Sequence, residues 1–252
     1  MKHFIIIDMK KILYCIAITF IPLLVNAQKN VTKFLGIPVD GTKTEMLNKI
    51  RAKGFRNVPG KSDVLTGEFN GQKVNVSVVT NKNKVYRVFL EETNTHDEIG
   101  IKIRFNKLCE QFKKNYKYIR ASDNDYTIPN EEDISYNISL QKKRYDAIYF
   151  QISKNIDTIT IPQNIINNIP EEYKDNDMFK KVIRLFLSSF KGNLDDITED
   201  NIKEIATNTA SNLLTTLSKC PVWFCISQEK HDQYRILMYY DNEYNQADGE
   251  DL

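Results

Sequence analysis

The sequence predicts an α+β protein made of two units in tandem, each a helix packed on an antiparallel sheet, and the second unit carries an inserted helical hairpin. Three observations support this class. Residues 64–90 alternate in polarity between tight-turn signals, capped helical patterns occur on either side of them, and two aromatic-rich strands close the fold. We expect a first unit at 28–92, a second unit at 93–240 with its insertion at about 155–219, and an acidic tail at 241–252.

Residues 1–27 have the features of a secretory signal peptide. Lys10 and Lys11 precede an apolar run at 12–25, and the small residue Ala27 ends the segment. The apolar run is about 14 residues long and falls short of the ~20 residues that span a bilayer. We therefore expect cleavage after Ala27 and secretion into the periplasm or outside the cell, with no stable membrane span after cleavage.

A short extended entry at 34–39 leads into the first predicted helix. Thr42 and Glu45 form a capping box, in which each side chain accepts a hydrogen bond from the backbone of the other residue. The helix is expected to end near Lys53, because Gly54 suits the left-handed position that follows a helix. Its apolar stripe, which should cover the sheet of this unit, consists of Met46, Leu47 and Ile50.

Residues 64–90 are predicted to form three antiparallel strands. Asn70-Gly71 favours a type I′ hairpin turn, because both residue types tolerate a positive φ. This turn pairs Phe69 with Gln72, Gly67 with Val74, and Leu65 with Val76. A second turn of three residues at 81–83, with Asn83 left-handed, would keep the register. One apolar face then comprises Leu65, Phe69, Val74, Val76, Val78, Tyr86, Val88 and Leu90.

The helical pattern recurs after residue 94. Thr95 and Glu98 suggest a second capping box, and the helix is expected to reach about Tyr118. The apolar stripe of this helix consists of Ile101, Phe105, Leu108, Phe112, Tyr116 and Ile119. Four strands should follow, at 134–140, 145–152, 222–227 and 234–240.

The insertion separates the second of these strands from the third. A connector rich in Asn and Ile at 159–170 precedes a predicted helix at 171–190, and Gly192 should stop that helix. A second helix is expected at 198–219. The short connection between them predicts an αα-hairpin that packs on the main body. The apolar side of the first helix consists of Phe179, Val182, Ile183, Phe186 and Phe190.

Composition limits the classes of partner. Removing residues 1–27 takes away three lysines and one aspartate from 35 basic and 33 acidic residues, so the mature chain is formally neutral. No basic stripe suggests a nucleic acid partner. About 225 residues remain, enough for a substantial core. An odd number of cysteines cannot pair fully within the chain, and we expect buried thiols, with a Cys109 disulfide as the alternative. The three are Cys109, Cys220 and Cys225.

The turn-and-cap run at 36–46 and the hairpin that follows it carry a family resemblance. Together with the tandem layout behind a signal peptide, they resemble β-lactamase-inhibitor-like proteins, and the small lipoproteins of outer-membrane β-barrel assembly share a related unit. The chain is also similar to a group of uncharacterised secreted bacterial proteins with the same opening and an Asp-Asn-Glu-Tyr-Asn close, here at 241–245. The resemblance implies a binding role by analogy and assigns no functional residue.

The sequence carries no recognised catalytic or cofactor motif. The mature chain has two histidines, His96 and His231, both at positions expected to be exposed. It has no Gly-x-Ser-x-Gly elbow, no His-Glu-x-x-His pair, no phosphate-binding glycine loop and no Cys-x-x-Cys zinc motif. We therefore expect no catalytic residue, no cofactor and no metal. Calcium binding by 123–125 or by the acidic tail is the alternative to a solvated acidic surface.

Adjacent carboxylates keep a hydrolase as the alternative function. A glycosidase needs two carboxylates roughly 5–9.5 Å apart. Glu91-Glu92, Asp97-Glu98 and residues 131–133 are the acidic groups. All fall at ends of predicted elements, where solvent or a helix N-terminus accounts for them.

Aromatic residues near the C-terminus lead to the predicted function. Alternation sends Trp223 and Phe224 to opposite faces of the sheet, and Tyr239 and Tyr240 likewise. One set belongs to the core, and the insertion is expected to cover the other; an exposed row would instead be a typical hot spot for a protein or sugar. Trp223, Tyr239 and Tyr234 are the candidate binding residues. We predict a secreted, non-enzymatic module that binds a protein partner; a hydrolase of an envelope or dietary polymer and a structural envelope protein are the alternatives.

Overall fold

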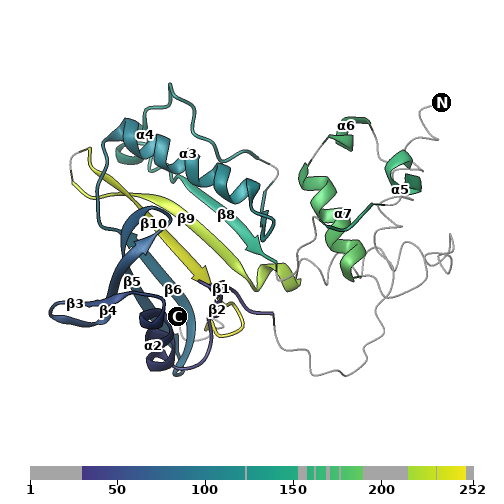
Figure 1. Cartoon of the computed structure of the whole chain (residues 1–252). Coiled ribbons are helices and arrows are strands. Elements are labelled where there is room, and N and C mark those ends of the chain that lie inside the picture. Colours follow the sequence, from purple (N-terminus) through teal and green to yellow (C-terminus); the bar gives the residue numbers. More distant parts are fainter. Residues whose placement is uncertain are drawn as a thin grey trace. The chain divides into compact units, whose positions relative to one another are not determined.

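The structure is a computed structural model that divides into two compact units, whose elements Figure 1 shows. The sheet unit contains the described residues of Asn30–Gln151 and Ser218–Leu252. The helical unit contains those of Ile152–Leu217. The described residues are 30–122, 124–152, 158–161, 163–168, 171–175, 177–189, 215–230 and 232–247.

One antiparallel sheet of eight strands forms the sheet unit. The strands lie in the order β3-β4-β5-β6-β10-β9-β8-β7, so β10 pairs with β6 and joins segments far apart in the sequence. The described part of the chain is thus α+β, as predicted, with its eight long-range strands joined in one continuous sheet. The strands are β3 (Arg56–Val58), β4 (Lys61–Phe69), β5 (Gln72–Asn81), β6 (Lys84–Glu92), β7 (Tyr118–Arg120), β8 (Asp146–Gln151), β9 (Pro221–Gln228) and β10 (Tyr234–Asp241).

The helices α2 (Lys43–Ala52), α3 (Glu98–Lys114) and α4 (Ile134–Ser139) pack on one face of the sheet, because their buried apolar side chains join the same core as those of the strands. Figure 1 shows α2 near β4–β6 and α3 near β8–β10. The small ribbon of β1 (Lys33–Phe34) and β2 (Ile37–Pro38) joins this core too. We call this face the covered face and its opposite the open face. In the described part of the sheet unit, no helix packs on the open face.

The first hairpin confirms the register that the sequence predicts. Asn70 and Gly71 both have positive φ, and the pairs Phe69–Gln72, Gly67–Val74 and Leu65–Val76 form as expected. The second turn differs from the prediction. It has two residues, Lys82 and Asn83, both with positive φ, and an irregularity after Val79 absorbs the difference. Val85 therefore enters the core, and Tyr86, which we expected there, stays partly exposed.

Helix α2 matches its prediction closely. The capping box between Thr42 and Glu45 is present, and Met46, Leu47 and Ile50 are buried against the sheet. After the helix, Gly54 has φ +99° and Phe55 turns into the core. The ring of Phe55 lies over Gly67 on β4, where a Cβ atom would stand 2.6 Å from the ring. The absence of a side chain at Gly67 therefore allows the Phe55 ring to approach the backbone of β4 closely.

Helix α3 is shorter than its apolar periodicity predicts. Asp97, and not Thr95, is the N-cap, and its side chain accepts a hydrogen bond from the Gly100 backbone N–H. The helix ends at Lys114. Tyr116 is 37% exposed, and Ile119 belongs to strand β7. Residues 116 and 119 match the helical spacing although they lie beyond the helix. Ile119 is apolar because it is the buried middle residue of strand β7.

The strand predicted at 134–140 is instead helix α4, with Leu140 as its C-cap. Asp133 caps the helix by accepting a hydrogen bond from the Tyr136 backbone N–H. Ile134 is buried and Ile138 packs against the core, whereas Tyr136 and Leu140 are exposed. The apolar residues at every second position fit both periods, but only the pair four residues apart faces inward.

Residues 241–245 belong to the fold and not to a solvated tail, which corrects another expectation. Asp241 ends β10, and both Asp241 and Asn242 are buried. The Asn242 side chain donates to the Val39 carbonyl oxygen, and the Asn245 side chain donates to Asp40 and to the Val85 carbonyl oxygen. The end of the sheet unit thus fixes the β1–β2 ribbon and the turn before α2. Residues 248–252 lie outside the described residues.

The helical unit contains α5 (Gln163–Asn168), α6 (Glu171–Lys174) and α7 (Asp177–Ser189). The single helix predicted at 171–190 is thus divided, and α5 occupies part of the predicted connector. Ile183 of α7 is buried with Ile161, and Phe179 packs beside them. Most of the predicted second helix lies outside the described residues, so the helical hairpin stays a prediction. None of the described helices combines the length and the apolar character that a bilayer crossing requires.

Candidate functional site: the open face of the sheet

A row of cross-strand partners runs across six strands on the open face. Each member is paired directly with the next, so the side chains stand side by side at right angles to the strands. All six keep part of their surface exposed, and Ile148 is 37% exposed. We call this set the cross-strand row, and in order from β4 to β8 it consists of Val64, Ser77, Phe89, Tyr239, Trp223 and Ile148.

Aromatic rings fill the centre of the row. Trp223 and Tyr239 stack with 3.8 Å between ring centroids and 10° between planes. Phe89 lies 5.1 Å from Tyr239 on the other side. The guanidinium carbon of Arg87 lies 5.0 Å from the Tyr239 centroid and 5.7 Å from that of Trp223, within range of a cation–π contact. The rings therefore cover one another's faces and turn their edges outward.

Asp241 holds this cluster from the end of β10. Its two carboxylate oxygens accept hydrogen bonds from Arg87 Nε (2.6 Å) and Nη2 (2.7 Å), and Oδ2 also accepts one from Trp223 Nε1 at 2.9 Å. The Asp241 side chain is only 4% exposed, so the pair is poorly screened by solvent. These hydrogen bonds raise the pKa of Arg87, and partial burial raises the pKa of Tyr239. The two-pronged pair fixes the stacked rings in place.

The charges beside the row are engaged in ion pairs with one another. Arg235 donates to Glu91 at 2.6 Å and lies 3.1 Å from Glu229, and Arg144 lies 3.4 Å from Asp146. Glu91, Arg235 and Asp146 flank one side of the row, and Arg87 with Asp241 flanks the other. The open face thus combines an apolar centre with charges of both signs, three arginines against four carboxylates.

The structure brings Trp223 and Tyr239 together but places Tyr234 elsewhere. Tyr234 is fully buried on the covered face, and its hydroxyl lies 2.6 Å from the hydroxyl of Ser135. Its backbone bridges to His96. Tyr234 therefore cannot reach a ligand on the open face, which corrects its place among the candidate binding residues.

His96 is also less exposed than its position suggests. Its side chain is 24% exposed, and Nε2 lies 3.8 Å from Glu92 Oε2; neither atom has a hydrogen-bond partner. The other carboxylate oxygen of Glu92 accepts two hydrogen bonds from Arg104, which binds the end of β6 to α3 across the covered face. His96 is thus only partly exposed, since its backbone pairs with Tyr234 at the start of the central strand β10. His231 lies outside the described residues.

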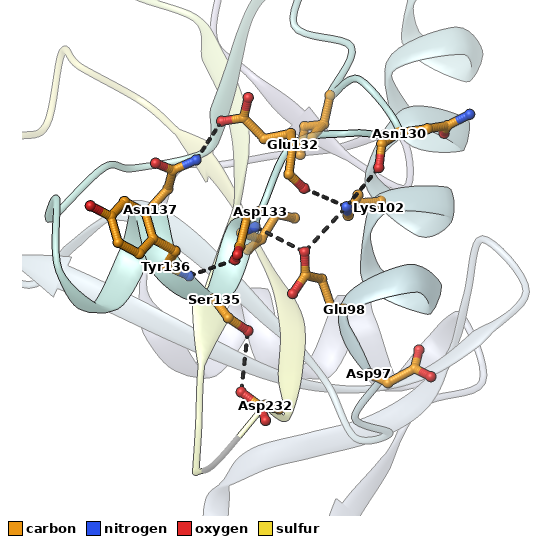
Figure 2. Close-up of polar contacts among 12 residues, drawn as sticks. Asp97, Glu98, Lys102, Asn130, Glu132, Asp133, Ser135, Tyr136, Asn137 and Asp232 are labelled. Carbon is orange, nitrogen blue, oxygen red and sulfur yellow. Dashed lines mark hydrogen bonds and ion pairs between the residues drawn. The ribbon is translucent and has the colours of Figure 1, made fainter.

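A second polar cluster joins α3 to the loop before α4. Figure 2 shows Lys102 pointing from α3 toward the backbone of Asn130 and Glu132, to whose carbonyl oxygens it donates. Glu98 lies 3.2 Å from the same ammonium group and accepts a hydrogen bond from the Ile134 backbone N–H. Every member has a partner within the cluster, so its evident role is to anchor the loop.

Of the carboxylates predicted at 131–133, Glu131 is exposed, and Glu132 and Asp133 are engaged structurally. Glu132 Oε1 accepts hydrogen bonds from Lys143, from Asn137 (2.9 Å) and from the Tyr145 hydroxyl (2.5 Å), and the lysine contact in particular lowers the pKa of Glu132. Asp133 caps α4, as described above. With Glu91 and Glu92 bound to arginines, these residues serve ion pairs and helix caps.

The three cysteines of the sheet unit are free thiols. Cys109 and Cys220 are buried as expected, whereas Cys225 is only half-buried, beside the cross-strand row on the open face. Burial raises the pKa of Cys225 to about 11. Within the described residues, no three His, Cys, Asp or Glu side chains are grouped as they would be around a metal ion.

Three residues of the site were not singled out by the sequence: Arg87, Phe89 and Asp241. Alternation along β6 places Arg87 and Phe89 on the open face once Val88 and Leu90 are assigned to the core, so the signal for them existed. Asp241 offered no such signal, because its partner Arg87 is 154 positions away in the chain.

Comparison of the chain with protein-family models, with curated proteins and with solved structures found no match.

Proposed function

We propose that this protein is a non-enzymatic binding module whose open sheet face receives a protein partner. The observation that supports this most strongly is the cross-strand row, in which Trp223 and Tyr239 are stacked, ordered by Arg87 and Asp241, and still partly exposed. Preordered aromatic side chains with little conformational freedom left to lose are the residues that dominate protein interfaces.

The arrangement of the rings favours a protein over a sugar. A sugar ring stacks on the open face of an aromatic side chain, but Trp223 and Tyr239 cover each other's faces. What they present is a ridge of ring edges between aliphatic side chains and paired charges. Such a ridge suits an apolar protein surface with a polar rim.

We also infer that the sheet consists of two related helix-plus-sheet units, one with α2 and β4–β6 and the other with α3 and β8–β10. The meeting of β6 with β10 at the centre of the sheet supports this division. The composition of the N-terminal segment supports a proposal of secretion, with cleavage after Ala27, and we therefore expect the partner in the periplasm or outside the cell.

The test uses the secreted chain, purified after expression from the full sequence, as bait in envelope extract. We compare the wild type with Ile148→Lys, which places a charge in the exposed end of the row. The matched control is Ile103→Lys, the same change at an isoleucine that is 63% exposed on α3. We expect a specific protein to be captured by the wild type and by Ile103→Lys, and lost with Ile148→Lys.

Two results would contradict the proposal. One is capture that is indifferent to Ile148→Lys, because the partner would then bind elsewhere on the chain. The other is turnover of a glycan or peptide panel by the purified wild type, which would support the carboxylate hydrolase instead. Mass spectrometry of the secreted chain tests the cleavage site separately, since a retained N-terminus would indicate an anchored protein.

A further inference from the structure

We infer that the protein partner received by the open face is a second copy of this chain, packed face to face about a two-fold axis that runs along the cross-strand row. This inference rests on the proposed function, since it names the partner for the same surface. Three features of the open face support it: its size, the balance of its charges, and the symmetry of their placement.

The open face has the dimensions of a standard interface. Six strands about 4.8 Å apart and three rows of residues about 6.8 Å apart give a flat area of roughly 600 Å². Protruding side chains add accessible surface to this flat area and bring it near the ~800 Å² per partner that stable complexes bury. Sheets that pack face to face keep their strands within about 30° of alignment, which would superpose the two rows at their centres.

Charge balance removes the usual obstacle to self-association. A face dominated by one sign would repel its own copy, but here three arginines stand against four carboxylates, and each of them is engaged in an ion pair. The mature chain also has no net charge once residues 1–27 are removed. A partner selected by electrostatic attraction would instead require an excess of one sign on this face.

The placement of the charges fits a two-fold axis along the row. Rotation about that axis sets each row residue opposite its own copy and sets one flank of the row opposite the other flank. Arg87 and Glu91 lie on β6 on opposite flanks, two residues either side of Phe89. Arg87 would therefore face Glu91 of the partner subunit, and by symmetry this contact occurs twice. The aromatic rings would meet edge to edge at the centre.

The experiment is sedimentation equilibrium of the secreted chain over a concentration series, with Ile148→Lys and Ile103→Lys in parallel. Two facing Ile148 positions become two facing lysines, whose repulsion should weaken the dimer by about 100-fold or more. Ile103→Lys makes the same change at a more exposed isoleucine on α3, 63% against 37% for Ile148, and should leave the dimer unaffected. Circular dichroism of both variants shows that they are folded.

Each alternative outcome contradicts the inference in a distinct way. A wild type that is monomeric up to about 100 µM excludes the second copy, while capture of another protein that is lost with Ile148→Lys would leave the proposed function intact. A dimer that survives Ile148→Lys would show that the chain associates through a different surface. A dimer that both lysine variants disrupt equally would point to a nonspecific effect of charge.

Discussion

On the covered face of the sheet, most strands bury mainly apolar residues at alternate positions, whereas on the open face the same strands carry rings, charges and hydroxyls, most of which stay partly exposed. Neighbouring residues show the contrast. Phe224 packs against Phe105 and Phe112 in the core, and Trp223 beside it is held by Asp241 at the surface. The covered face holds the buried apolar core, and the open face holds rings that Arg87 and Asp241 fix in place although they stay partly exposed. That order is what we assign to binding.

The largest expected contrast is between Phe224→Ala and Trp223→Ala. Phe224 is fully buried, so its truncation should cost about 3–5 kcal/mol of unfolding free energy. Trp223→Ala loses one stacking partner and one hydrogen bond on a partly exposed face, and should cost about 1–2 kcal/mol. Urea unfolding followed by circular dichroism measures both. Equal losses of unfolding free energy would mean that the open face contributes as much to stability as the covered face.

Glu91 and Glu92 offer the same contrast for charged residues. Glu92 is bound to Arg104 with both side chains less than a tenth exposed, and Glu92→Ala would leave the arginine buried without its partner, at a cost of about 3–5 kcal/mol. Glu91 is 33% exposed and its ion pair with Arg235 should be worth about 1 kcal/mol or less. Chemical unfolding of the two alanine variants tests this; a larger loss at Glu91 would contradict the assignment of faces.

Crowding on the covered face predicts a smaller effect at Gly67. An added Cβ would lie 2.6 Å from the Phe55 ring, so Gly67→Ala should cost about 1–3 kcal/mol. Replacement of Phe55 by leucine in the same chain should recover part of this loss, because the overlap is with the ring. A double-mutant cycle measures the coupling, and strictly additive effects would show that Phe55 is not the cause.

The smallest effect concerns thiol reactivity and leaves stability unchanged. Cys225 on the open face should be alkylated before Cys109 and Cys220, which are buried. Burial raises the pKa of Cys225 to about 11, so little thiolate exists near neutral pH and the rate should rise about tenfold per pH unit until the pH approaches that pKa. Burial raises the pKa of Cys109 further, to about 12. Mass spectrometry of partly alkylated protein resolves the sites. Earlier modification of Cys109 would contradict the assignment of the faces.

Local signals predicted the parts of the fold that are encoded locally. The Asn70-Gly71 turn and the Thr42–Glu45 capping box depend on residues within a few positions of each other, and both are confirmed. The spacing of apolar residues gave a wrong prediction where it fits both a strand and a helix. The apolar residues at 134 and 138 suit a strand or a helix turn, and the Asp133 cap decides for the helix.

The candidate site could be predicted only in part, because it depends on pairing between strands that are far apart in the sequence. Alternation correctly separated Trp223 from Phe224, and Tyr239 from Tyr240, because a strand has only two faces. It could not show that β10 lies beside β6, which brings Phe89 and Arg87 to these rings. Tyr234 was misplaced because the aromatic residues were grouped by proximity in the sequence, whereas its own alternation with Tyr239 sends it to the core.

Trp223 is the only tryptophan of the chain, so its fluorescence reports on the open face directly. The decisive measurement is acrylamide quenching of Trp223 emission in the secreted chain over a range of protein concentrations, with Ile148→Lys as the comparison. We expect quenching to fall as the wild-type concentration rises, because a second copy covers the row, and to stay constant in Ile148→Lys. Quenching that is independent of concentration in the wild type would show that no second copy covers Trp223.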